Sequence, residues 1–386
     1  MPFTGKATYS AGGGLPELAE DVSDLVGLSS PHETPLLDAL GDPARPARST
    51  VHEWIEDSLL PNTDAVNDIT YTNPLTDGTF GVDNVSRFRV GDQIQLEGDG
   101  EIMLVTAVNI GGGTISVTRS YGGTPAASLA DNKVIRILGN ASLEGDDAAA
   151  VRFTNRVRKS NYTQIFTATV EVSGSELAVR QAGVRDELDY QKQQRLRELL
   201  RDMENCVING VAPTVTGEGS ATVRRTMRGF VPAIATNIFA PGVAGFPAGT
   251  TLSEDQLNLA LRAVWKGSSG AVDLIVVNGA QKRAINNFVQ ANRRFTPDGE
   301  SFKNLVSVYE SDYGVCRVVL SRFVPKGCVL LLDSSRIEVM PLAGRSFHYK
   351  PLASTGDREA GQLIGEYTVE FRNEGAHGYI KGMADD

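Results

Sequence analysis

Apolar residues recur at helical spacing along one continuous segment, residues 184–208. They fall on one face of a helix, and nearly all the other positions carry Asp, Glu, Lys, Arg or Gln. A helix of this length is on the order of 35 Å long. A rod of that length is more typical of a structural building block than of a pocket. The apolar positions are Val184, Leu188, Leu196, Leu199, Leu200, Met203, Val207 and Ile208.

A different pattern, with a period of two, marks the segment from 77 to 140. Alternating apolar residues predict a strand at 87–98, a hairpin at 101–121 around three consecutive glycines, and a closing strand at 132–139. These elements predict a small β-barrel or sandwich. It is inserted between the two strands of a longer β-ribbon, which we expect at 48–58 and 151–172.

In the C-terminal half, segments with the hydrophobic period of a helix alternate with segments that have the pattern of a strand. A helix is predicted at 251–267, where Ser253 and Gln256 match a capping box and Gly267 a helix stop. A short buried strand at 271–279 and a second helix at 280–289 follow. The remaining chain predicts further strands and ends in a strand pair within 361–383. The body is therefore expected to have an α+β fold.

Residues 1–47 are typical of an extended arm rather than a domain. A glycine run is followed by scattered apolar positions, among them Leu36, Leu37 and Leu40, and then by a linker containing Pro43 and Pro46. Such a segment has too few apolar residues for a core of its own. We expect it either to bind along a neighbouring surface or to be a loose terminus.

Composition narrows the class of protein. The 386 residues are 41% hydrophobic and carry a formal net charge of −10, which argues against a protein built to hold nucleic acid. No apolar run reaches the length of a membrane span, and the N-terminus lacks a signal-peptide core. Cys206, Cys316 and Cys328 form no CxxC pair and are expected to be reduced. These features predict a cytoplasmic protein.

The sequence lacks the common motifs of catalytic, nucleotide-binding and metal-binding sites. The sequence contains no P-loop, no GxGxxG, no GxSxG and no paired metal-ligand spacing, so we expect no catalytic, cofactor or metal site. His52 and His377 are interpreted as surface or interface residues. Glu53, Glu56 and Asp57 form an acidic group in which a carboxylate pair for acid–base catalysis is the less favoured interpretation. Charge on a solvated or intersubunit strand is favoured instead.

Basic residues gather at three places. Arg152, Arg156, Arg158 and Lys159 lie on the strand expected opposite the acidic group, so cross-strand pairs would join the two strands or match a neighbouring subunit. The other two clusters are Arg224, Arg225 and Arg228, and Arg293 with Arg294. For these, a salt bridge between subunits is favoured over phosphate binding.

The order of these parts resembles the major capsid proteins of tailed phages with the HK97-like fold, in particular the SU10-type family. The matching segments are TPLLDAL at 34–40, HEWIEDSL at 52–59, EVSGSELAVRQAG at 171–183, RTMRGF at 225–230, LIVVNGAQKRAINNF at 274–288, VSVYESDYG at 306–314 and LASTGDREAGQLIGEYTVEFRNEGAHGYIKG at 352–382. They span nearly the whole chain except the β insert.

The resemblance implies a division of the chain. Residues 1–47 would be the N-terminal arm, and 48–172 an extended loop carrying the inserted all-β subdomain at 77–140. Residues 173–224 and 335–386 would form the peripheral domain, with the spine helix at about 184–208. Residues 225–334 would form the axial domain. The large extended loop departs from the simplest pattern of the family, and no residue pair for covalent cross-linking is identified.

The function implied is structural: self-assembly, as hexamers and pentamers, into an icosahedral shell around double-stranded DNA. The DNA would be contacted on the inner surface without sequence specificity. Scaffolding, portal and decoration proteins are further implied partners, with assembly in the bacterial cytoplasm, location in the virion and no membrane contact. The expected inter-subunit contacts are Leu36, Leu37, Leu40, Glu53, Trp54, Ile55, Glu56, Arg152, Phe153, Arg156, Arg158, Arg293 and Arg294.

Three alternatives remain open on the sequence. The first is a cargo-holding nanocompartment shell of the same fold. The second is a hydrolase that uses the carboxylates at 53–57. The third is a binding module centred on 77–140, with carbohydrate as the example ligand. Protein cargo in purified particles, loss of activity in Glu53→Gln, and glycan binding by 77–140 would respectively support them.

Overall fold

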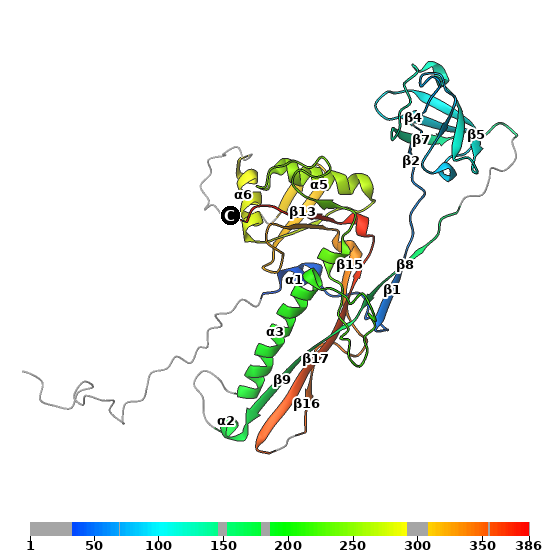
Figure 1. Cartoon of the computed structure of the whole chain (residues 1–386). Coiled ribbons are helices and arrows are strands. Elements are labelled where there is room, and N and C mark those ends of the chain that lie inside the picture. Colours follow the sequence, from blue (N-terminus) through cyan, green and yellow to red (C-terminus); the bar gives the residue numbers. More distant parts are fainter. Residues whose placement is uncertain are drawn as a thin grey trace, which may run out of the picture. The chain divides into compact units, whose positions relative to one another are not determined.

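The computed structural model describes residues 33–68, 70–145, 153–178, 186–291, 308–353 and 356–385 (Figure 1). The chain divides into two compact units. Unit 1 comprises residues 1–54 and 158–386, and unit 2 comprises residues 55–157. The chain passes between the units through a two-stranded ribbon of β1 (Val51–Glu56) and β8 (Val157–Tyr162).

A six-stranded sheet lies at the centre of unit 1. Its strands follow the order β10 (Ile238–Phe239), β18 (Gly378–Ile380), β14 (Val329–Leu332), β11 (Leu274–Val277), β13 (Gly314–Leu320) and β12 (Val308–Ser311). β11 is parallel to β13 and antiparallel to β14, and every residue of β11 and β14 is buried. Because side chains alternate across a strand, this sheet contributes to two separate apolar clusters, one on each face.

One of these clusters lies beneath α5 (Glu254–Gly267), close to α6 (Gly279–Ala291). The predicted capping box is confirmed, since Ser253 Oγ accepts from Gln256 N and Gln256 Oε1 accepts from Ser253 N. α5 buries Leu257, Leu261 and Val264 against the sheet. The predicted order of helix, buried strand and helix is thus confirmed.

The second sheet of unit 1 is built around β17 (Arg358–Phe371). β9 (Gln164–Ser173) pairs with one edge of β17 over ten residues, while β15 (Ile337–Pro341) and β16 (His348–Pro351) pair with the other edge. The long helix predicted from the sequence is α3 (Glu187–Asn209), which packs on this sheet. Asp186 caps α3 by accepting from Asp189 N, and the buried residues of α3 lie only in its C-terminal half.

Three short helices complete unit 1. They are α1 (Pro35–Leu40), α2 (Gly174–Ala178) and α4 (Phe230–Ala233). Among the described residues, no helix combines the length and the apolar character needed to cross a membrane. All three cysteines are free thiols, as predicted.

Unit 2 is a small six-stranded barrel. Its strand order is β2 (Thr63–Ala65), β7 (Val134–Asn140), β4 (Asp92–Leu96), β5 (Ile102–Asn109), β6 (Thr114–Thr118) and β3 (Thr79–Gly81). The edge strands meet through a bridge between Val66 and Val82 and a hydrogen bond from Asn67 N to Gly81 O, so the sheet closes. Its core has the fully buried Ile94, Met103 and Ile115.

Three expectations need correction. The barrel begins at Thr63, ahead of the predicted 77, because β2 adds a strand too short to show alternation. The strand expected at 151–172 is broken into β8 and β9 at Thr163, whose buried hydroxyl donates to Glu366. The predicted final strand pair is wrong. β17 and β18 belong to different sheets, because Asn373 adopts a left-handed conformation (φ 51°) and turns the chain between them.

Candidate assembly interfaces

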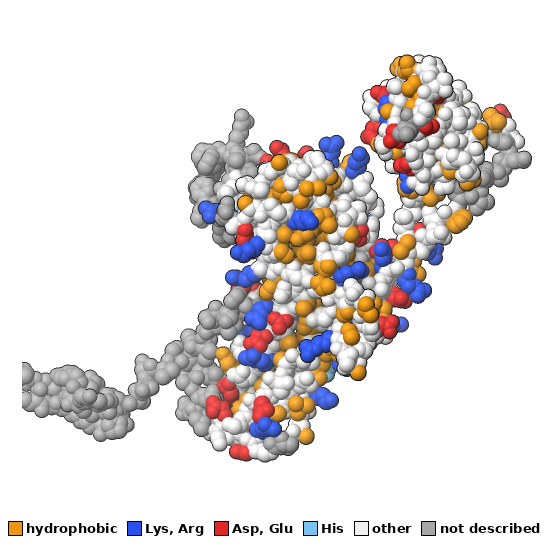
Figure 2. All heavy atoms as spheres, viewed as in Figure 1, with side chains coloured by type: hydrophobic (Ala, Val, Ile, Leu, Met, Phe, Trp, Pro, Cys, Tyr) orange, Lys and Arg blue, Asp and Glu red, His pale blue; other side chains and the backbone are white. Residues whose placement is uncertain are grey.

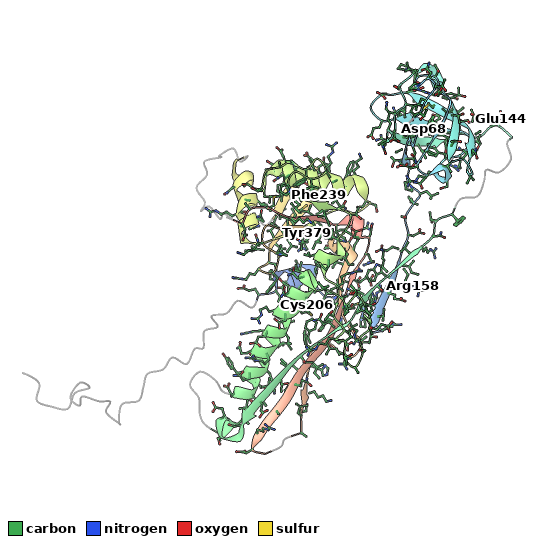
Figure 3. The ribbon with its side chains drawn as sticks, in the orientation of Figure 1. Asp68, Glu144, Arg158, Cys206, Phe239 and Tyr379 are labelled. Carbon is green, nitrogen blue, oxygen red and sulfur yellow. The ribbon has the colours of Figure 1, made fainter. Side chains whose placement is uncertain are left out.

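The β1–β8 ribbon carries the charge pairs expected from the sequence. Glu53 Oε2 lies 3.4 Å from Arg158 Nη1, and Asp57 Oδ2 lies 3.8 Å from Arg156 Nε (Figure 3 labels Arg158). Each of these four side chains is about half exposed or more, so one pair contributes at most about 1 kcal/mol. The carboxylates at 53 and 57 are thus engaged with arginines on an open strand surface, an environment unlike that of a catalytic acid–base pair.

Apolar side chains on and beside this ribbon face solvent. Ile55 is 63% exposed and Phe153 is 76% exposed, whereas Trp54 is only 7% exposed and lies beside the His52 ring. Ile55 and Phe153 therefore remain available to a neighbour, and Trp54 is largely used within the chain. Glu56 is half-buried.

The other predicted contact residues are either packed on the core of unit 1 or lie outside the described residues. Leu36 has no exposed surface and belongs to the apolar core of unit 1, with Leu37 and Leu40 packed against that core. Leu36 is therefore a core residue rather than an anchor for a neighbour, because α1 folds back onto its own chain. Arg152, Arg293 and Arg294 lie outside the described residues.

A carboxylate missed by sequence reasoning lies at the root of the ribbon. The side chain of Glu370 on β17 is 1% exposed and accepts hydrogen bonds from His52 Nε2 at 2.5 Å and Arg45 Nη2 at 3.2 Å. Arg372 Nε lies 3.1 Å away. The hydrogen bond from His52 lowers the pKa of Glu370, and the arginines act in the same direction. His52 is therefore a structural partner of β17 rather than the surface residue predicted.

A second buried carboxylate, Glu366, lies four residues earlier on β17. It accepts from Thr163 Oγ1 at 2.6 Å and Arg225 Nη2 at 2.5 Å, and Arg345 Nε lies 2.7 Å from its other oxygen. The salt bridge that we expected Arg225 to make between subunits is made within the chain instead. In sequence, Glu366 and Glu370 are four residues apart and so lie on the same face of a strand. Charged residues at this spacing are as typical of a solvated face as of a buried one.

His377 also departs from expectation, since it is fully buried rather than exposed at a surface. Its Nδ1 accepts from Asp333 N at 3.2 Å, and its Nε2 donates to Arg372 O at 3.2 Å. Burial lowers the pKa of His377 to about 4. A neutral imidazole with both nitrogens bonded to backbone is a structural element, because neither nitrogen is left to accept a substrate proton.

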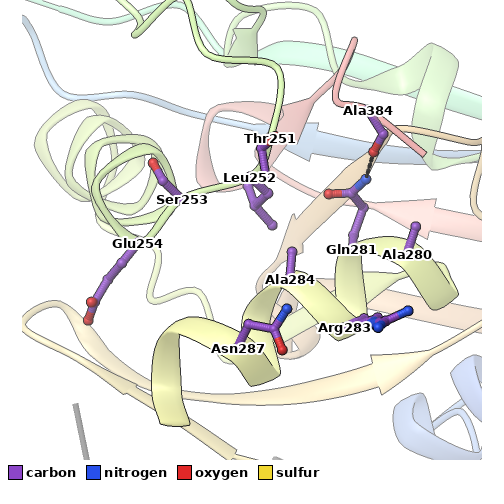
Figure 4. Close-up of a pocket in the computed structure, with 10 residues that line it drawn as sticks. All are labelled: Thr251, Leu252, Ser253, Glu254, Ala280, Gln281, Arg283, Ala284, Asn287 and Ala384. Atoms are coloured by element: carbon purple, nitrogen blue, oxygen red, sulfur yellow. Dashed lines mark hydrogen bonds between the residues drawn. The ribbon is translucent and has the colours of Figure 1, made fainter. Parts of the chain in front are cut away.

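A cavity of about 570 Å³ lies between the start of α5 and α6. Figure 4 shows its polar lining, which includes Ser253, the cap of α5, and Gln281, whose Nε2 donates to Ala384 O at 2.6 Å. None of the described residues that line it is a histidine. Within the described ranges, no three His, Cys, Asp or Glu side chains are grouped as a metal site would require.

One face of the described residues lacks the appearance of a nucleic-acid groove (Figure 2). On the face drawn in Figure 2, acidic and basic side chains are interspersed over unit 1 and form no continuous basic surface. The features that remain are those of a packing unit: a solvent-facing ribbon, buried ion clusters at its root and a long helix on a sheet.

Comparison with known families decides the class. The sequence model of the SU10 major capsid proteins matches residues 3–384. The chain belongs to this family. No curated protein sequence matches it.

Two solved capsids share the fold of this family member across nearly all of its length. For the capsid of a native GTA particle, the match covers 98% of this chain and 99% of the GTA capsid chain, at 12% identity and a TM-score of 0.55. The capsid of Myoviridae phage XM1 covers 94% and 97%, at 9% identity and a TM-score of 0.50. The predicted HK97-like α+β capsid fold is confirmed. An encapsulin complex from Synechococcus elongatus covers 60% and 78%, at 10% identity and a TM-score of 0.43.

Proposed function

We propose that this major capsid protein assembles, as hexamers and pentamers, into an icosahedral head shell that encloses double-stranded DNA. The family match over residues 3–384 carries the proposal. The fold supports it, because β1 and β8 project solvent-facing apolar and charged groups instead of enclosing a pocket. Heterologous contacts that close into rings are what such a shell requires.

We assign the parts of the chain as the family resemblance implies, except for two strands. The resemblance implies that residues 1–47 are the arm and 48–172 the extended loop with its barrel; we assign β9 to the body instead, because it pairs with β17. The resemblance places 173–224 and 335–386 in the peripheral domain and 225–334 in the axial domain; we assign β18 to the axial domain, because it pairs with β10 and β14. The passage of the chain out of unit 1 after Trp54 and back at Arg158 supports the extended-loop assignment. The wholly buried β11 and β14 support a rigid axial domain.

The ribbon is the proposed contact surface between copies. Ile55 on β1 and Phe153, four residues before β8, are its exposed apolar anchors, and Glu53, Glu56, Arg156 and Arg158 give the two strands and their flanks both signs of charge. Mixed charge around an apolar contact favours one register of docking over others, because a mismatch places like charges together. Leu37 and Leu40 flank the same chain's core and remain secondary candidates.

Assembly in the bacterial cytoplasm and residence in the virion follow from this role. Scaffolding, portal and decoration proteins are proposed as partners, and DNA is contacted without sequence specificity. A net charge of −10 fits a shell that does not adhere to its own cargo. A structural role without catalysis is proposed on the same grounds.

Electron microscopy of the purified full-length chain, with and without the phage's other assembly proteins, tests the proposal. Closed shells or capsomer lattices are expected. Ile55→Ser with Phe153→Ser should reduce shell yield at unchanged folding. Leu143→Ser is the matched control, since Leu143 is 79% exposed in the same unit but lies off the ribbon. A small oligomer under every condition would refute the shell. Particles filled with protein instead of nucleic acid would favour the nanocompartment.

A further inference from the structure

A carboxylate is buried beside an apolar cluster of unit 1. Glu204 on α3 has no exposed surface, although its neighbours Met203 and Val207 belong to the apolar cluster beneath the helix. Burial raises the pKa of Glu204, which reflects the cost of removing its charge from water. An apolar side chain would fill this position without that cost, so the carboxylate is expected to have a specific partner.

Its partners come from two other parts of the chain. Glu204 Oε2 accepts from Leu36 N at 3.1 Å and Leu37 N at 3.3 Å, and Oε1 accepts from Ser321 Oγ at 2.7 Å. Leu36 and Leu37 lie in the first turn of α1, where backbone donors have no intrahelical acceptor. α1 begins at Pro35, and its N-cap Thr34 makes no side-chain cap bond. Glu204 therefore caps α1 from another helix.

The helix seated in this way belongs to the same chain as Glu204. Only six residues separate Leu40 from Ala47, and Ala47 is fixed to the body by hydrogen bonds with Pro341 O and Ala343 N. Six residues span roughly 20 Å when extended, so α1 stays close to its own body while Ala47 is held. The position of α1 then determines where the described chain begins on unit 1.

We propose that Glu204 acts as a latch: its hydrogen bonds hold α1, the helix of the arm, in one position on unit 1. We further propose that α1 must be held there, or seated, for the shell to assemble correctly. When α1 is seated, all three hydrogen bonds of the carboxylate are made and Leu36 fills the core. When α1 leaves, the charge loses two of its three donors in an apolar groove. Partly seated or shifted arms are therefore disfavoured, and the assembly role rests on the proposed shell function.

Replacing the carboxylate tests the latch. Glu204→Leu leaves Leu36 N, Leu37 N and Ser321 Oγ without their acceptor, so it should free α1 locally. Because a freed α1 also withdraws Leu36 from the core, the urea midpoint should fall too, and the hydrogen exchange of α1 is therefore compared with that of α3 in the same molecule. Glu204→Gln should retain the latch, because its amide oxygen still accepts from α1 and its NH₂ group donates to Ser321 Oγ. Met203→Ala is the control for core damage alone, since Met203 is 6% exposed on the same helix.

Hydrogen exchange of residues 33–40 in the full-length unassembled protein, measured beside shell yield, tests the proposal. In Glu204→Leu, protection of the α1 amides should fall by at least about tenfold relative to the C-terminal half of α3, and shells should be few or malformed. Met203→Ala should lower the urea midpoint without changing this ratio, and Glu204→Gln should resemble the wild type in both readouts.

Two results would overturn the proposal. Unchanged α1 protection in Glu204→Leu would show that Leu36 packing alone seats the helix. Lost protection with normal shells would show that arm seating does not govern assembly. If the wild type forms no shells under any condition, the proposed shell function fails, and the exchange data still decide whether the latch exists.

Discussion

The burial of His377 predicts a steep loss of stability in mild acid. The ring is fully buried and stacks on Phe371 with centroids 4.1 Å apart, and its Nδ1 faces the N–H of Asp333. Protonation would place a second N–H against that donor in a buried site. The pKa therefore falls from the ordinary 6.5 to about 4, with burial as the largest cause.

The magnitude follows from linkage. A displacement from 6.5 to about 4, at about 1.4 kcal/mol per pH unit, is worth roughly 3 kcal/mol. The folded pKa lies below the unfolded value, so this stability is fully present above pH 6.5 and is lost as pH falls toward 4. Glu370 and Asp333 have lowered pKa values and lose their contributions only at lower pH, since their ordinary values are 4.5 and 3.8.

Urea unfolding of the unassembled chain at several pH values between 7.5 and 4.5 measures this effect. Both tryptophans, Trp54 and Trp265, lie in unit 1, so their fluorescence reports the unit that contains His377. The wild type should lose stability faster than His377→Gln, with a difference approaching roughly 3 kcal/mol at the acid end. His348→Gln is the control, because His348 is exposed and its Nδ1 donates to Ser346 O. Parallel pH profiles for the wild type and His377→Gln would refute the reasoning.

Further substitutions probe other parts of the fold. Leu36→Ala should lower the free energy of unfolding in urea by about 2–5 kcal/mol, because it empties a fully buried site. A change near zero would show that α1 does not pack on unit 1. Glu101→Gln should destabilise the barrel by about 3–5 kcal/mol, leaving Arg119 buried without its bidentate partner; hydrogen exchange in residues 92–118 measures this, and unchanged exchange there would contradict it. Gly327→Ala should cost more than about 1 kcal/mol, because φ is +65° and a Cβ would meet the backbone of Met383. Gly344→Ala, with φ +75° but open space around it, should cost less in the same urea assay, and equal costs would dismiss the clash.

Periodic elements could be predicted from the sequence because their burial repeats. The face of α3, the capping box of α5 and the hairpin of β5 and β6 each place apolar or capping residues at fixed spacing. Pairing between distant strands could not be predicted in the same way. Both β17 and β18 have the pattern of a strand, and only the left-handed Asn373 between them directs the two to different sheets.

Buried charge was the part of the candidate interfaces least accessible to sequence reasoning. Glu204, Glu366 and Glu370 are each nearly or fully buried. In sequence, a single glutamate on a helix or strand is as typical of a solvated face as of a buried ion cluster. Each of the three has at least one partner from a segment more than 100 residues away, such as Ser321 for Glu204, Thr163 for Glu366 and His52 for Glu370. Such partners are set by tertiary packing. The predicted contacts Ile55 and Phe153, by contrast, are exposed in the structure, and their role between subunits stays a prediction.

The paired strands β1 and β8 have an evolutionary consequence. They deliver the two ends of the barrel segment side by side, so the body meets the same two strand ends whatever lies between them. Closing a longer or shorter loop across such a neck changes the free energy only slowly with length. The neck is therefore a natural splice point, because replacing the segment between β1 and β8 leaves the strand pairing of the body unchanged.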